Sequence, residues 1–331
     1  MDYSSHLQNV RTNFPELNSS LLEETEFDLF RNEEFASRCI SICITLCNNA
    51  SAKLNINVNF AVNFNYVFNA TATVKNQYAV ITFNLGLIEK LETIISDSIE
   101  LFLKEDVASL TIDKEQIYKL KNISNKCCIS YLFYHELAHV LQLSSASSND
   151  IYNYQEIYSI QDSFDIRKHV YEIDADLFGS NMAVFELFED IRDINNQFSS
   201  ITLFNLLTAL LFTTANVIIE FSENSFQEIY YKQGSHPHPL IRIVKCSEQI
   251  LSFASKNLSI QKPFFEAILQ RNGAMISQIN YSSGRRVDYP KLYSENSIDI
   301  ESYSDEIDSL NEQYKELIRF RSQDLFNVLT N

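Results

Sequence analysis

The stretch Tyr131-Leu-Phe-Tyr-His135-Glu136-Leu-Ala-His139-Val-Leu-Gln-Leu143 is an apolar run that contains the pentapeptide HELAH. Its composition predicts a buried helix. On a helix, His135 and His139 lie one turn apart on the same face, so both imidazoles can bind one metal ion, and zinc favours such nitrogen ligands. Glu136 follows the first histidine, where this motif places a general base for a metal-activated water. The pentapeptide HELAH also occurs by chance. It therefore indicates a metal site only if other parts of the chain supply the remaining ligand.

A zinc site of this kind needs a third protein ligand and one open position. The segment Tyr171-Glu172-Ile-Asp174-Ala-Asp176 supplies candidates, because Glu172 and Asp176 lie on one face of a predicted helix. Glu172 can reach the metal, and Asp176 can orient a ligand histidine by accepting its second N–H. Asp174 and Glu156 are weaker rivals for the third position. The alternative interpretation is a solvated acidic face, which is common in an acidic chain.

A loop with two prolines, Gly234-Ser-His236-Pro-His238-Pro239, holds two of the six histidines. Proline fixes its own φ and keeps the preceding residue away from helical geometry, so we predict a sharp loop. His236 can donate a hydrogen bond to a developing oxyanion, and His238 is the weaker candidate. The alternative is that both histidines are exposed loop residues.

The composition limits the partners of the chain. It has 331 residues, of which 45% are hydrophobic and 12% aromatic, and such a composition is globular. The formal net charge of -17 argues against nucleic acid or an anionic membrane surface as the main partner. The N-terminus lacks the pattern of a secretory signal, and the six cysteines form no disulfide framework. We therefore expect a cytoplasmic protein with buried, reduced thiols.

The segment Ile201 to Phe221 is apolar over about the length that a bilayer requires. It also contains Asn205, Asn216 and Glu220, and no basic cluster flanks it. Because basic flanks normally anchor a spanning helix, the pattern favours a buried helix of a soluble domain.

Hydrophobic periodicity predicts an α+β fold that is mostly helical and has a small N-terminal antiparallel sheet. Alternating apolar residues predict strands over 54–73, with a break or a hairpin inside, and over 77–84. Asn122 or Ser124 is expected to cap the helix that carries HELAH. Residues from about 277 are expected to form a loosely structured connector. Further helices are predicted over 24–48, 166–189, 201–221, from 240 onward and over 298–329.

The motifs HExxH, E-x-x-x-D and H-P-x-x-x-x-R-I follow one another in this chain. Because it carries these motifs in this order, the chain resembles the gluzincin metallopeptidases. The closest patterns are those of the HtpX and CAAX-prenyl endopeptidase group and of the Lit-type phage-exclusion peptidases. The strand and turn from Ala79 to Gly86 also looks like the strand before the active-site helix of that group. The resemblance covers about residues 78 to 245. Ser235 stands where that group usually has Thr, and the single apolar segment fits a soluble, Lit-like member better than a membrane-embedded one.

The resemblance implies a zincin-like peptidase domain at 51–260, an N-terminal helical segment at 1–50 and a C-terminal helical extension at 261–331. It implies a Zn²⁺-dependent endopeptidase that hydrolyses a protein or peptide substrate. We expect an extended substrate to pair beside the strand near Tyr78 to Phe83. The implied roles are zinc ligation by His135, His139 and Glu172, base catalysis by Glu136, oxyanion stabilisation by His236, orientation of a ligand by Asp176, and pairing of Arg242 with a nearby carboxylate.

Two other classes of function stay open at this point. The chain could be a zinc-binding effector or sensor, of a phage-defence or toxin-like kind, that is latent until a partner activates it. It could also be a binding protein without catalytic activity. Activity that appears only with a second component would favour the first class, and a substoichiometric metal content would favour the second.

Overall fold

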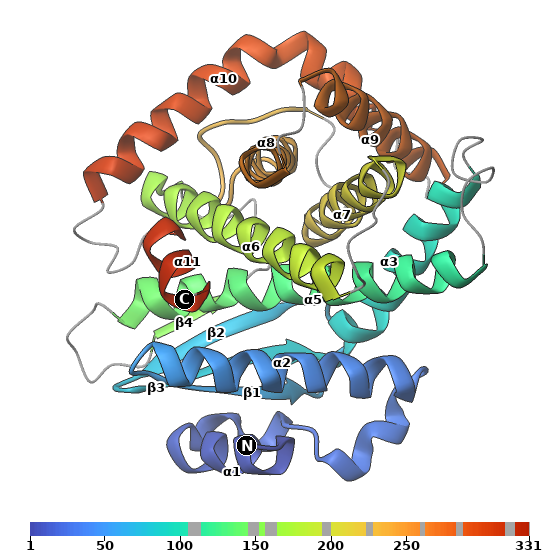
Figure 1. Cartoon of the computed structure of the whole chain (residues 1–331). Helices are drawn as coiled ribbons and strands as arrows, with labels where there is room; N and C mark the ends of the chain where they lie inside the picture. Colours follow the sequence, from blue (N-terminus) through green and yellow to red (C-terminus); the bar gives the residue numbers. More distant parts are fainter. Residues whose placement is uncertain are drawn as a thin grey trace.

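The computed structural model describes residues 1–104, 114–144, 152–155, 164–193, 200–222, 228–258, 262–282, 287–314 and 322–330. Within these residues the chain is mostly helical with one small sheet, which confirms the α+β class. Figure 1 shows the layers: N-terminal helices, the sheet, two long central helices, and a set of C-terminal helices.

The sheet has four strands in the order β1-β3-β2-β4. β1 pairs with β3 in parallel, whereas β2 is antiparallel to both β3 and β4. The sheet is therefore mixed, and the prediction of an antiparallel sheet was wrong. β4 was not predicted from the sequence. The strands are β1 (Asn57–Asn63), β2 (Ala70–Lys75), β3 (Tyr78–Asn84) and β4 (Tyr152–Gln155).

The segment between β1 and β2 explains the parallel pair. It crosses the end of β3 instead of forming a hairpin, since the N–H of Gly86 donates to the carbonyl of Asn65 at 2.9 Å. A side chain at position 86 would overlap the carbonyl oxygen of Tyr66. The hairpin forms one strand later, between β2 and β3, where Asn76 has a φ of 56°. Asparagine tolerates this left-handed conformation better than most residues.

The position of β3 shows that the expected pairing of a substrate beside Tyr78 to Phe83 was wrong. β3 lies between β1 and β2, so both of its edges are already paired along Tyr78 to Phe83. A peptide cannot add a strand there, because strand addition needs a free row of backbone groups.

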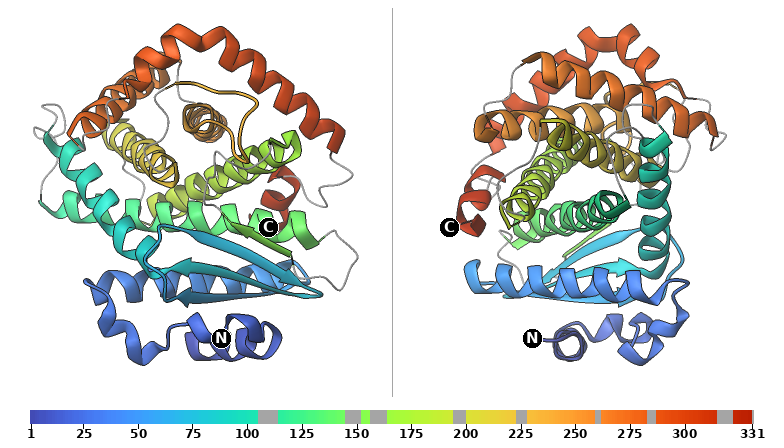
Figure 2. Two further views of the ribbon diagram at one scale, coloured as in Figure 1. Left: turned by 180° about the vertical axis from the view of Figure 1, so that it is seen from behind. Right: turned by 45° about the vertical axis from the view of Figure 1, so that its right-hand side comes forward.

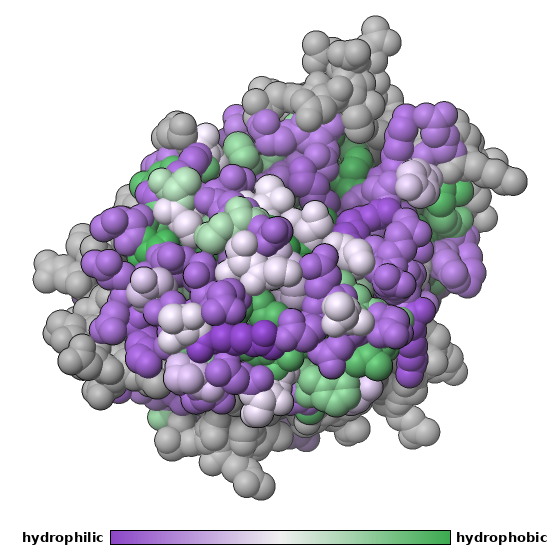
Figure 3. All heavy atoms as spheres, turned by 90° about the horizontal axis from the view of Figure 1, so that it is seen from below, coloured by the Kyte–Doolittle hydropathy of each residue, from purple (hydrophilic) through white to green (hydrophobic). Residues whose placement is uncertain are grey.

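Helices α1 (Tyr3–Asn13) and α2 (Glu33–Lys53) pack against β1. Two short 3-10 helices, Pro15–Ser20 and Glu24–Leu29, precede α2, so the helix predicted from residue 24 is broken. Asn32 caps α2 by accepting the N–H of Phe35 at 3.0 Å. Polar side chains dominate the outer face of this layer in Figure 3, with apolar ones scattered between them. The helices thus turn their apolar sides to the sheet.

The central helices are α5 (Lys114–Ser144) and α6 (Ile166–Asp193), which pack along each other. Figure 2 shows them between the sheet and the C-terminal helices. α5 lies on β2 and β3, and it begins well before Asn122 and Ser124, so the predicted cap was wrong. The helix predicted from residue 166 is confirmed as α6.

Helix α3 (Leu85–Lys104) follows β3, and five more helices complete the described chain. In Figure 1, α8 is seen end-on inside a ring formed by α6, α7, α9 and α10. The connector predicted from residue 277 was wrong, because α9 continues to Ser282 and α10 begins at Tyr289. The five helices are α7 (Ser200–Phe221), α8 (Pro239–Leu258), α9 (Lys262–Ser282), α10 (Tyr289–Tyr314) and α11 (Ser322–Thr330).

One helix in the described part of the chain, Leu203–Phe221, is long and apolar enough to cross a membrane by length and composition. Of the most apolar 18-residue stretch of this helix, 83% is buried inside the fold. Two of its polar side chains donate hydrogen bonds there: the Thr213 hydroxyl donates to the Ala209 carbonyl at 2.9 Å, and the Asn216 amide donates to Ser98 at 3.0 Å.

One cluster of buried apolar side chains extends from Tyr3 to Ile307. α2 runs across the boundary predicted after residue 50, and the boundary predicted after residue 260 lies outside the described residues. Whether the three predicted segments are separate domains stays a prediction.

Gly179 sets how closely α6 approaches α5. A Cβ at this position would lie 2.7 Å from the carbonyl oxygen of Tyr131. We predict that Gly179→Ala lowers the free energy of unfolding by about 1–3 kcal/mol, as overpacking does, despite the better helix propensity of alanine. Urea unfolding measures the change. Gly273→Ala is the control, since a Cβ there meets its nearest atom at an ordinary 3.5 Å; equal effects of the two changes would contradict this packing.

Candidate metal centre

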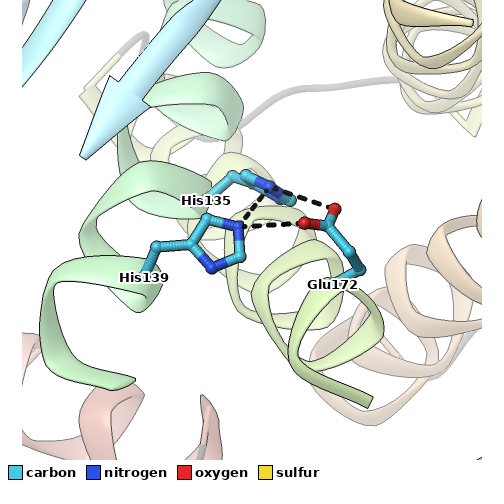
Figure 4. Close-up of side chains that lie close together, drawn as sticks. All are labelled: His135, His139 and Glu172. Carbon is cyan, nitrogen blue, oxygen red and sulfur yellow. Dashed lines mark hydrogen bonds and ion pairs between the residues drawn. The ribbon is translucent and has the colours of Figure 1, made fainter. Parts of the chain in front are cut away.

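His135, His139 and Glu172 form a buried group that could hold a metal ion. α5 supplies the two histidines from successive turns, and α6 supplies the carboxylate (Figure 4). The Nε2 atoms of the histidines are 3.0 Å apart. The Glu172 oxygens lie 3.8 Å from Nε2 of His135 and 3.5 Å from Nε2 of His139. The structure thus brings together the three side chains that the sequence singled out, and the group could hold a metal ion.

The distances between these ligand atoms are similar to those expected around one shared cation. Bonds of about 2.0–2.2 Å in tetrahedral geometry place two ligand atoms roughly 3.3–3.5 Å apart. The three separations in this group, 3.0, 3.5 and 3.8 Å, bracket that value. The donor set of two imidazoles and one carboxylate therefore fits a metal ion.

The tautomer of His135 is set by Asp176. Nδ1 of His135 lies 3.1 Å from a carboxylate oxygen of Asp176, and an ionised carboxylate only accepts hydrogen bonds. Nδ1 therefore carries the hydrogen, which leaves the lone pair of Nε2 directed at His139 and Glu172. The orienting role of Asp176 stays a prediction, and its carboxylate lies close enough to Nδ1 of His135 to perform it.

Gln142 sets the tautomer of His139 in the same way. Its Oε1 lies 2.7 Å from Nδ1 of His139, and its Nε2 donates to the carbonyl of Tyr171 at 3.0 Å and to Asp174 at 3.3 Å. Since the amide nitrogen is committed to these acceptors, Oε1 accepts the Nδ1 hydrogen of His139. Both Nε2 lone pairs and the Glu172 carboxylate then face one point, where a cation relieves their mutual repulsion.

Gln142 was not predicted from the sequence. A signal existed, because an amide three residues after His139 lies on the same helix face and interrupts an apolar run. Among the described residues, the group that could hold a metal ion contains Glu172 and not Asp174, whose carboxylate accepts from Gln142. Glu156, the other rival, lies outside the described residues.

Arg242 joins the two carboxylates of α6. Its Nε and Nη2 donate to the two oxygens of Asp176 at 2.7 and 2.8 Å, and Nη2 lies 3.4 Å from Glu172. Tyr131 also donates its hydroxyl to Asp176 at 2.7 Å. Burial alone would raise the pKa of Asp176, but Arg242 and His135 outweigh it and hold the pKa at about 2. Asp176 is therefore ionised at neutral pH, as the pairing with Arg242 predicts.

Glu172 is also ionised. Burial opposes its charge, but the neighbouring His236 and Arg242 favour it and bring the pKa of Glu172 well below its ordinary value. Nε2 of His236 lies 3.3 Å from an oxygen of Glu172, and its Nδ1 is 2.8 Å from the Ser235 hydroxyl. The structure thus brings His236 to the group of ligands.

The two loop histidines are buried, so their interpretation as exposed residues was wrong. His238 has a structural contact: its Nδ1 accepts the N–H of Leu240 at 3.1 Å in the first turn of α8. Burial lowers its pKa to about 3, so it is neutral. Glu136, the predicted base, is buried directly after His135 in α5, with 1% of its surface exposed.

A scan against protein-family models, a search of curated proteins and a search of solved structures each found no match for this chain. The resemblance to gluzincin peptidases therefore rests on the three sequence motifs alone.

The double contact of Arg242 generates a stability prediction. Arg242→Met leaves buried, ionised carboxylates without their main counter-charge, and we predict a loss of about 3–5 kcal/mol in the free energy of unfolding. Urea unfolding in the presence of a metal chelator measures this loss without a contribution from bound metal.

The control for this prediction is the double variant Arg242→Met with Asp176→Asn. Asparagine keeps an acceptor for Tyr131 and His135 but removes the charge, so part of the lost stability should return. A double variant no more stable than Arg242→Met would contradict the electrostatic explanation.

Proposed function

We propose that this protein is a zinc metallopeptidase with a zincin-like fold around α5 and α6. The observation that carries the proposal is the convergence of two imidazole lone pairs and one buried carboxylate, with Glu136 next to the first ligand. In hydrolases that carry HExxH on a helix, catalytic zinc is bound by two nitrogens and one oxygen of the protein, and a fourth coordination position stays open.

The chemistry would be divided between the metal and the side chains of this chain. Zinc, when bound by His135, His139 and Glu172, supplies Lewis acidity that activates water and polarises a carbonyl. Glu136 takes the proton from the attacking water and passes it to the leaving amine. His236 donates a hydrogen bond toward the negative charge that develops on the substrate carbonyl. Its contact with Glu172 supports this role.

The substrate would be an extended peptide paired with the edge strand β4. β3 is excluded because both of its edges are paired. The outer edge of β1 is partly covered, since Leu22 donates its N–H to Val62 at 2.9 Å and Phe64 donates to Ser20 at 2.6 Å. Among the described strands, β4 is the other edge strand, and it follows α5, the helix of the two candidate histidine ligands, in the chain. Backbone pairing there would bind a peptide without requiring a particular sequence.

The first prediction of this proposal concerns the metal content. We expect about one zinc per chain after gentle purification, and a much lower content for His135→Ala and Glu172→Ala because each removes a ligand. Elemental analysis measures zinc, iron and other metals together. Glu189→Ala, on the same helix, is the control and should keep its metal. A wild type that holds far less than one metal ion would favour a binding protein without catalytic activity.

The second prediction concerns Glu136. Glu136→Gln should keep zinc but slow cleavage by about 10²–10⁴-fold, because glutamine cannot act as a base. New protein N-termini in host cells that express wild type, compared with cells that express this variant, identify the substrate and measure its cleavage. Cleavage by the variant at the wild-type rate would defeat the proposed role.

One observation favours the latent alternative. The three ligands and Glu136 each expose 2% of their surface or less, so a protein substrate needs an opening to reach them. A wild type that holds zinc but cleaves only after a second component is added would identify the protein as an effector that a partner activates.

A further inference from the structure

One loop lies directly against the candidate metal centre. Residues 228–238, called the histidine loop below, lead into α8 and carry His236. Nε2 of His236 lies 3.3 Å from the Glu172 carboxylate, and His236 exposes 4% of its surface. A molecule that approaches Glu172 from the side of this loop must therefore displace His236 first.

His169 of α6 connects the histidine loop to α10. Burial lowers the pKa of His169 to about 4, so the ring is neutral. Its Nε2 lies 3.4 Å from the carbonyl oxygen of Gly234, and its Nδ1 lies 2.7 Å from the hydroxyl of Tyr303. A carbonyl oxygen only accepts hydrogen bonds, so Nε2 donates to Gly234 and Nδ1 accepts the hydrogen of Tyr303. One side chain of α10 thus supports the start of the turn that holds His236.

Two further contacts join the histidine loop to α10 directly. The ring of Tyr231 packs on the ring of Tyr303, with centroids 5.6 Å apart. Nζ of Lys232 lies 2.7 Å from a carboxylate oxygen of Glu306. Tyr303 and Glu306 are three residues apart and so share one face of the helix. The ion pair has side chains that are 55% and 41% exposed, and such pairs contribute little to stability.

Helix α10 is attached by few buried side chains. It lies along the outer side of the C-terminal helices (Figure 1), and Asp308 pairs with Lys245 of α8 at 2.7 Å. A segment with few buried apolar contacts separates from a fold at a lower free energy than the core does. α10 has 26 residues. The large apolar side chains that it buries, among those described, are Tyr289, Ile300, Tyr303 and Ile307.

We propose that α10 is a latch on the metal centre. It holds the histidine loop, and with it His236, against Glu172, and separation of α10 from this loop opens the site. The inference rests on the proposed function, since the latch regulates a peptidase only if the site is catalytic. It identifies α10 as the helix that an activating partner would displace.

A covalent lock tests the latch in the full-length, metal-free protein. The six native cysteines are buried, so cysteines introduced by Lys232→Cys and Glu306→Cys are the ones that react with maleimides. The tips of the two side chains that they replace are 2.7 Å apart, so 1,2-bismaleimidoethane can link the two positions. The same double variant with N-ethylmaleimide on each cysteine is the unlinked reference.

Diethyl pyrocarbonate, which modifies accessible neutral imidazoles, reports the opening, and mass spectrometry measures its reaction at each histidine. The lock should slow modification of His135, His139 and His236 about tenfold, because buried groups react only while the site is open. His6 is the internal control. It is buried beside Asn59 of β1, far from α10 in the fold, and should react at the same rate in both proteins.

A second lock controls for the reagent. Lys291→Cys and Glu295→Cys place the two cysteines one turn apart within α10, at side chains that are 66% and 59% exposed. The same linker between them restrains no contact with the histidine loop. This lock should leave the modification rates of all histidines unchanged.

A variant that weakens the latch tests it in the opposite direction. Tyr303→Phe keeps the ring but removes the hydroxyl that donates to His169. His135, His139 and His236 should then react about fivefold to tenfold faster, the effect of about one hydrogen bond on the opening equilibrium. Tyr293→Phe, at a 37% exposed position of the same helix, should react as wild type does. A general loss of stability would accelerate the modification of His6 as well, so the rates relative to His6 report the latch.

Two results would each overturn the proposal. One is equal modification of His135, His139 and His236 in the linked and unlinked forms of the Lys232→Cys, Glu306→Cys variant. The other is equal modification of Tyr303→Phe and Tyr293→Phe, which needs no introduced cysteine. Because every measurement uses metal-free protein, a lack of zinc binding or of cleavage would refute the proposed function without changing these rates.

Discussion

Two buried carboxylates on one face of α6 impose the requirement that organises this structure. Glu172 and Asp176 are one turn apart, and neither is exposed to solvent. Ionised carboxylates in a protein interior need positive partners or strong donors, because burial removes their hydration. α8 supplies Arg242 to both of them, and α5 supplies His135 to the second. These contacts tie α5, α6 and α8 together around the two carboxylates.

The same contacts prepare a place for a cation. Asp176 lies 3.1 Å from Nδ1 of His135 and Gln142 lies 2.7 Å from Nδ1 of His139. With a hydrogen on each Nδ1, which these acceptors favour, both Nε2 atoms are left as acceptors toward Glu172. A buried polar network of this kind is stable only when each member is satisfied. Glu172 has Arg242 and His236 beside it, and a metal ion placed between Glu172 and the two imidazoles would bind all three side chains together. Orientation by a second layer of side chains is also what tunes metal affinity in proteins.

Local spacing in the sequence was enough to predict that His135, His139 and Glu172 converge, but not the order of the strands in the sheet. The i, i+4 pairs in HELAH and in Glu172 to Asp176 fix faces of helices, whatever the rest of the fold does. Strand order depends instead on contacts between distant segments. The crossing of β3 by the segment after β1, which Gly86 permits, has no periodic signal, and neither does the short strand β4. The burial of His236 and His238 likewise depends on the packing of α8 inside its ring of helices.

The central claim is that one zinc ion lies among these three side chains, and its position is directly measurable. Diffraction from crystals of the purified protein, collected on both sides of the zinc absorption edge, locates any bound zinc. The account predicts one anomalous peak within bonding distance of Nε2 of His135, Nε2 of His139 and the Glu172 carboxylate, with a fourth coordination position left to solvent. A peak bound elsewhere, or crystals with no zinc even after soaking in zinc, would contradict it.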